Sequence, residues 1–81
     1  MKFKKKPVII EAIQWHGNLE DLKPFIDAGM EYTFTDAKKL WIRTLEGSMC
    51  VKENAWVIKG VQGEFYPCQG DIFEETYEAA E

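Results

Sequence analysis

The chain has 81 residues, of which 46% are hydrophobic and 14% aromatic, and its formal net charge is −4. This composition excludes a disordered protein, and the acidic balance argues against a general nucleic-acid binder, which usually presents a basic face. The longest apolar run, Val8 to Ile10, is too short to span a membrane, and the opening MKFKKKPVII lacks the apolar core of a secretory signal. We therefore expect a single domain, residues 1–81, in the cytoplasm.

The first predicted element is a strand from Lys2 to Trp15, interrupted by Pro7, which suits an edge position or a bulge. Lysines crowd its start, where they would protect a solvated edge from aggregation. Glutamates crowd the other end of the chain, and the two groups would neutralise each other if the termini lay side by side. These residues are Lys2, Lys4, Lys5 and Lys6, and Glu74, Glu75, Glu78 and Glu81.

One helix is predicted over residues 19–28. Asn18 is a favourable N-cap, and the apolar residues that follow it recur at helical spacing. Pro24 interrupts this pattern, so it should kink the helix or divide it into a first turn and a second short piece. Gly29 is a natural helix stop.

Alternating apolar and polar residues separated by turn signals predict strands over most of the remaining chain. We expect them at Glu31–Thr35, Leu40–Thr44, Ser48–Glu53, Trp56–Lys59 and Glu64–Cys68. The last segment, DIFEETYEAA, favours a short turn of helix followed by a strand that pairs with the lysine-rich start. The predicted fold class is therefore α+β: a curved, mainly antiparallel β-sheet with one short, Pro-kinked helix.

Residues of the kind used in catalysis are few. Cys50 and Cys68 match no zinc or redox spacing, and we interpret them as two small buried thiols. His16 is the one histidine, and a Cys–His nucleophilic pair would require contact in space. The glycines Gly60 and Gly63 suit a hairpin turn better than a phosphate loop. We predict no catalytic residue, no metal and no cofactor.

The sequence has more residues of the kinds that bind a ligand than of the kinds that catalyse a reaction. Aromatic rings stack on a planar ligand, and guanidinium or ammonium groups meet phosphates. For each tryptophan the alternative is a plain core role. The candidate ligand-binding residues are Trp15, Trp41, Arg43, Lys59, Gln62, Glu64 and Tyr66.

Several predicted strands are apolar on both faces, as in Trp56–Lys59, where Val57 opposes Trp56 and Ile58. A solvated antiparallel sheet should have a polar outer face, and one short helix can cover only one side. The second face is then expected to be buried by another copy of the chain, most economically in a two-fold dimer or a higher homo-oligomer.

Three stretches carry a resemblance to a known group of proteins: FKKKPVIIEAIQW, LWIRTLEGSMCV, and WVIKGVQGEFYPC followed by DIFEETYE. The chain resembles small, mostly uncharacterised proteins encoded by tailed phages and prophages, over nearly its whole length. This resemblance implies a phage protein acting in the host bacterial cytoplasm. It implies no activity and no catalytic residue.

In that setting we expect a non-enzymatic, homo-oligomeric sponge that sequesters a nucleotide-derived bacterial immune signal, such as a cyclic dinucleotide or an ADP-ribose derivative. Aromatic rings would stack on the base, Arg43 and Lys59 would take the phosphates, and Gln62 and Glu64 would bind the base or ribose. The alternative is a protein-interaction module that docks on a host protein, or a minor structural component. A small hydrolase using His16 or a cysteine is the third hypothesis.

Overall fold

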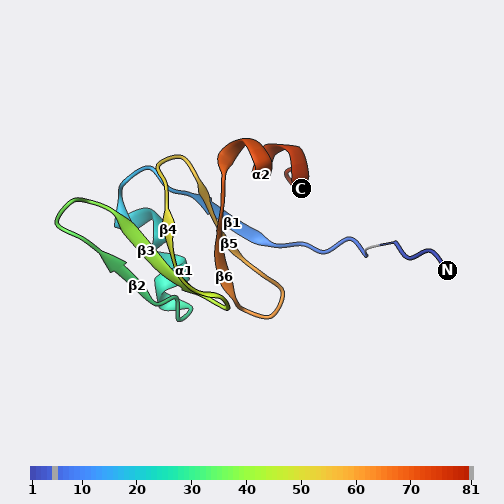
Figure 1. Cartoon of the computed structure of the whole chain (residues 1–81), viewed down its shortest axis with the longest axis horizontal. Helices are drawn as coiled ribbons and strands as arrows, with labels where there is room; N and C mark the ends of the chain where they lie inside the picture. The colour runs from blue at the N-terminus through green and yellow to red at the C-terminus, as the bar shows by residue number, and fades with distance from the viewer. Residues whose placement is uncertain (5, 81) are drawn as a thin grey trace.

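The computed structural model describes residues 1–4 and 6–80, so Lys5 of the lysine cluster and Glu81 lie outside the described residues. Six strands form two three-stranded antiparallel sheets, and two short helices accompany them (Figure 1). The α+β class is confirmed, although the strands make two sheets where one curved sheet was predicted. Within residues 1–4 and 6–80, neither helix has the length and apolarity needed to cross a membrane.

The first sheet has the strand order β1-β5-β6, with β5 in the centre. The second has the order β2-β3-β4, and β6 lies against β3 and β4, so the two sheets meet there. The strands are β1 (Glu11–Gln14), β2 (Tyr32–Phe34), β3 (Leu40–Thr44), β4 (Gly47–Val51), β5 (Trp56–Lys59) and β6 (Phe65–Cys68).

The predicted turns form as their sequences require. The two residues Leu45 and Glu46 join β3 to β4, and Gly47 begins β4 with a φ of 106°, a conformation that favours glycine. The β5–β6 turn closes with the N–H of Gly60 donating to the carbonyl of Glu64 at 2.8 Å, and Gly63 has a φ of 81°. The hairpin interpretation of these glycines is confirmed.

The Pro-kinked helix predicted over residues 19–28 is also confirmed. It consists of a 3-10 turn, Leu19–Leu22, followed by α1, Lys23–Asp27. Asn18 caps the turn, because its side-chain oxygen accepts a hydrogen bond from the N–H of Glu20 at 3.0 Å. Pro24 lies at the start of α1, where its missing N–H removes no helical hydrogen bond.

Both sheets and α1 contribute to one hydrophobic core. Phe25 of α1 packs on Phe65 of β6 with ring centroids 5.4 Å apart, and Trp15 packs edge-on against Phe34 at 5.8 Å. Leu40 and Ile42 point from β3 into the same core and are fully buried. The outer face of the β2-β3-β4 sheet has Thr33, Arg43 and Ser48 together with Trp41 and Cys50, so it mixes polar and apolar side chains.

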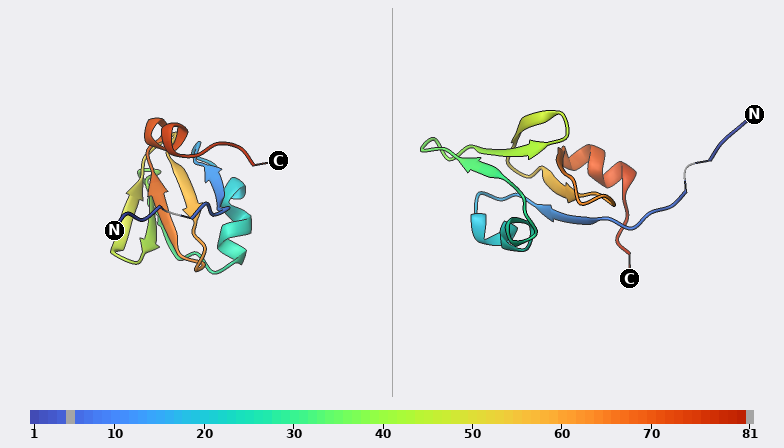
Figure 2. Two further views of the ribbon diagram at one scale, coloured as in Figure 1. Left: turned by 90° about the vertical axis from the view of Figure 1, so that its right-hand side faces the viewer. Right: turned by 90° about the horizontal axis from the view of Figure 1, so that it is seen from below.

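Against the second face of the β1-β5-β6 sheet lies α2, Gly70–Thr76, at the end of the sheet where β6 leads into the helix (Figures 1 and 2). The ring of Phe73 stacks on Trp56 with centroids 4.3 Å apart and an interplanar angle of 11°. Ile58 lies on this face and is fully buried. The C-terminal helix thus covers part of the face that was expected to need a second copy of the chain, and the homo-oligomer itself stays a prediction.

One predicted strand forms only in part, and another does not form. Residues 1–4 and 6–10 have no strand structure, and only Glu11–Gln14 of the predicted Lys2–Trp15 strand is paired. The reason is that β5 has four residues, all already matched by β1, and Pro7 cannot donate a ladder hydrogen bond. The chain after α2 also has no strand: the predicted pairing of Tyr77 and Ala79 with the N-terminal lysines is absent from the described residues.

We expect Phe73→Ala to lower the free energy of unfolding by about 2 kcal/mol, because it removes the ring that stacks on Trp56 and uncovers that face of the sheet. Ile72, on the same helix, is 50% exposed, and Ile72→Ala should change stability by no more than about 0.5 kcal/mol. Urea unfolding followed by tryptophan fluorescence measures both. Equal effects of the two substitutions would contradict the role assigned to Phe73.

Candidate functional site

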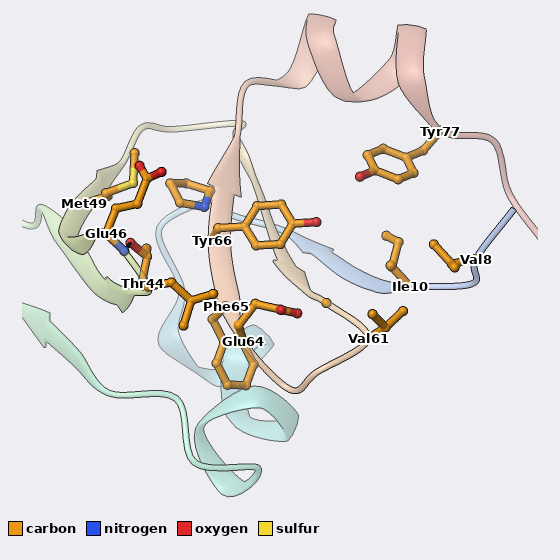
Figure 3. A pocket seen from close by; sticks show the side chains of 13 residues that line it. Val8, Ile10, Thr44, Glu46, Met49, Val61, Glu64, Phe65, Tyr66 and Tyr77 are labelled. Atoms are coloured by element: carbon orange, nitrogen blue, oxygen red, sulfur yellow. Dashed lines mark hydrogen bonds between the residues drawn. The ribbon is translucent and has the colours of Figure 1, made fainter. Parts of the chain in front are cut away.

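A surface groove of about 590 Å³ crosses β6. Tyr66 of β6 forms its floor, and Tyr77, which follows α2, overhangs it (Figure 3). The base of the N-terminal segment and the tip of the β5–β6 turn form one end, and the β3–β4 turn forms the other. We call this recess the β6 groove; the residues at its two ends include Val8, Ile10 and Val61, and Leu45, Glu46 and Met49.

The chemistry of the β6 groove is apolar with an acidic margin. Its surface comes mainly from aliphatic side chains and the two tyrosine rings, and carboxylates stand at Glu46 and Glu64. The described residues that line it include no lysine and no arginine. Glu64 is held in place, because its Oε1 accepts a hydrogen bond from the N–H of Gln62 at 3.3 Å.

The two tyrosine hydroxyls of the groove point toward one another (Figure 3). Burial, together with the neighbouring Tyr77, Glu64 and Cys68, which disfavour the phenolate, raises the pKa of Tyr66 to about 12. Tyr77 in turn packs on Phe73 with ring centroids 5.0 Å apart. The stacking that fixes α2 therefore also fixes the tyrosine that overhangs the groove.

The structure scatters the seven predicted ligand-binding residues. Trp15 is 3% exposed and belongs to the core. Trp41 and Arg43 share the outer face of β3, as the alternation predicted, and both are exposed. Lys59 lines a separate shallow recess beside the turn that contains Gln62.

Only Glu64 and Tyr66 of the predicted set meet in the β6 groove. Arg43 and Glu64 share a different recess beside Gly29 and Glu31. A single chain thus does not bring Trp15, Trp41, Arg43 and Lys59 to one ligand. The prediction overlooked Tyr77, although its four-residue spacing from Phe73 was a helical signal that both rings face one side.

The side chains considered for catalysis lie in structural settings. His16 Nδ1 is 3.0 Å from Oδ1 of Asn54, in the turn before β5. Cys50 and Cys68 are free and half-buried, so they are less enclosed than the two small buried thiols predicted from the sequence. Burial, aided by Asp71, raises the pKa of the Cys68 thiol, which lowers its thiolate fraction and hence its nucleophilicity.

No group of three His, Cys, Asp or Glu side chains among the described residues is placed to hold a metal ion. Comparison with models of known protein families, with curated proteins and with solved structures found no match to this chain. The resemblance to phage proteins therefore stays a prediction, and the groove is interpreted from its own chemistry.

We expect one tyrosine to ionise late in an alkaline titration followed by tyrosinate absorbance, and Tyr66→Phe to remove that late step. Because the pKa of Tyr66 is raised from 10.0 to about 12, the stability that this group contributes is full below pH 10 and is lost as the pH rises toward 12. The matched substitution Tyr32→Phe, at an exposed tyrosine, should leave the late step in place. A late step that survives Tyr66→Phe would assign it to another residue.

Proposed function

We propose that this protein is a non-enzymatic interaction module that binds an extended polypeptide segment of a partner protein in the β6 groove. The observation that carries the proposal is the lining of the groove, which is apolar along its length and has carboxylates but no described cation at its margin. Such a surface is complementary to a segment that alternates apolar with basic side chains. Together with the resemblance to phage proteins, it suggests a host protein in the bacterial cytoplasm as the partner.

The geometry of the groove supports a peptide better than a compact polar ligand. Its ends lie on different elements, so a ligand must contact both the β3–β4 turn and the N-terminal segment to fill it. The side chains at these ends are strongly exposed in the free chain: Leu45 is 79% and Val61 67% exposed. Covering them on binding would remove apolar surface from water, which is the main driving force of association.

We expect a synthetic peptide in which Phe and Val alternate with Lys to bind the protein in isothermal titration calorimetry, and its counterpart with Glu in place of Lys not to bind. Salt should weaken the binding, because part of the attraction is between exposed charges. Leu45→Ser and Val61→Ser should each weaken it by about tenfold, through lost apolar contact.

Ile72→Ser is the matched control, because Ile72 is also exposed but does not line the groove. Its affinity for the basic peptide should equal that of the unmodified chain. Equal binding of the basic and the acidic peptide, or an equal loss in Ile72→Ser, would refute the groove as the binding site.

Sequestration of a nucleotide signal is the second candidate function. It is favoured by the meeting of Glu64 and Tyr66 in one groove, whose volume falls in the range of roughly 300–1,000 Å³ usual for ligand sites. The neighbouring recess that contains Lys59 shares Ile10, Gly60 and Val61 with this groove, so Lys59 is the nearest candidate for a phosphate contact. In this function a homo-oligomer would supply further cations from a second copy.

If the protein sequesters such a signal, ADP-ribose or a cyclic dinucleotide should bind at micromolar concentration and be recovered unchanged after denaturation. Lys59→Ala should then weaken binding at least about tenfold, since a phosphate would lose its cation. Lys52→Ala, at an exposed lysine outside both recesses, is the control. Absence of binding by both nucleotides would leave the interaction module as the function.

A further inference from the structure

The N-terminal segment, residues 1–10, presents apolar side chains to solvent without a partner for them. Its described part is extended and runs away from the body of the molecule (Figures 1 and 2). Phe3 is 88%, Val8 53% and Ile9 81% exposed. Apolar side chains gathered on one exposed, unpaired stretch are typical of a surface that another polypeptide covers.

The segment has the chemistry for which the β6 groove is suited. Lys2, Lys4 and Lys6 are exposed and alternate with other residues around Phe3, so the segment combines cations with an aromatic ring. The groove offers an apolar surface with Glu46 and Glu64 at its margin. Charge and hydrophobicity are therefore complementary between two parts of the same chain.

The fold directs the segment away from the groove of its own chain. Val8 and Ile10 already form one end wall of that groove, and the residues before Pro7 continue outward from this wall. Pro7 fixes its own φ and restricts Lys6 to an extended backbone, which limits folding back. A segment that is stiff and extended before binding also loses less entropy when it docks.

We propose that two copies of the chain exchange residues 1–6, each copy seating Phe3 and its flanking lysines in the β6 groove of the other. This inference rests on the proposed function, because it concerns the same groove. It names the segment that occupies the groove when no external partner is bound. Six extended residues reach about 20 Å, enough to follow a groove across one small sheet. The arrangement is two-fold and self-complementary, since each copy supplies one segment and one groove.

Exchange of this kind also regulates the groove. An external partner must displace the exchanged segment, so its apparent affinity falls as the protein concentration rises and dimers accumulate. The exchange gives a second reason to expect the homo-oligomer predicted from the sequence. This reason is the fit between the segment and the groove, whereas the first was the apolar second face of the sheet.

Sedimentation equilibrium on charge-swapped full-length chains tests the exchange. One variant reverses the segment (Lys2→Glu, Lys4→Glu and Lys6→Glu), and a second reverses the margin of the groove through its two carboxylates (Glu46→Lys and Glu64→Lys). We expect the unmodified chain to dimerise and each variant alone to raise the dimer dissociation constant at least about tenfold. A chain with both reversals should dimerise again, because the charges are complementary once more.

Lys52→Glu and Glu53→Lys are the matched controls, since both residues are exposed and lie on the turn before β5. They should leave the dissociation constant unchanged. A chain that is monomeric at about 1 mM, or a dimer that neither reversal weakens, would overturn the exchange. Failure of the combined variant to recover while it remains folded by circular dichroism would also overturn it.

The peptide titration separates this inference from the proposed function. If the chain is monomeric and binds the basic peptide, the proposed interaction module is supported and only the exchange is refuted. The opposite outcome is a dimer that follows the charge-swap pattern while the segment-reversed variant binds no basic peptide. That outcome would support the exchange and refute binding of an external partner.

Discussion

The structure depends on a central strand that is buried on both faces. Val57 of β5 points into the core shared with α1 and the second sheet, while Ile58 points to the opposite side, and both are fully buried. Burial of apolar surface is the dominant favourable contribution in so small a chain. The chain meets this requirement with its own C-terminal helix, whose Phe73 stacks on Trp56.

Covering that face also creates the groove. Because Phe73 of α2 stacks on Trp56 and Tyr77 packs on Phe73, Tyr77 overhangs Tyr66 on β6. Because β5 is short, β1 ends its pairing at Glu11 and the residues before it run past the sheet as the other wall. Stability and recognition thus share the same contacts: a change that loosens the Trp56–Phe73 stack must also displace one wall of the groove.

Local chemistry predicted much of this fold. Asn18, Pro24 and the glycines of the hairpins define helix starts and turns through interactions within a few residues, so the sequence was sufficient there. Contacts between residues far apart in the chain decide what covers the second face of a sheet. The two apolar faces of Trp56–Lys59 were therefore equally compatible with a covering helix and with a second copy of the chain. The same limit applies to the site: strand alternation placed Trp41 beside Arg43, but it carried no information on which faces of different strands come together.

The composition of the chain gains a physical interpretation from the groove and the N-terminal segment. A protein with a net charge of −4 has a cluster of lysines at one end, and such an uneven charge costs little while the lysines are solvated. In the proposed exchange, the lysines would keep the apolar segment from pairing indiscriminately with other strand edges, and they would favour a surface that combines carboxylates with apolar side chains. In the proposed exchange, the same residues would act against non-specific association and in favour of one partner, and the groove over β6 combines carboxylates with apolar side chains as that exchange requires.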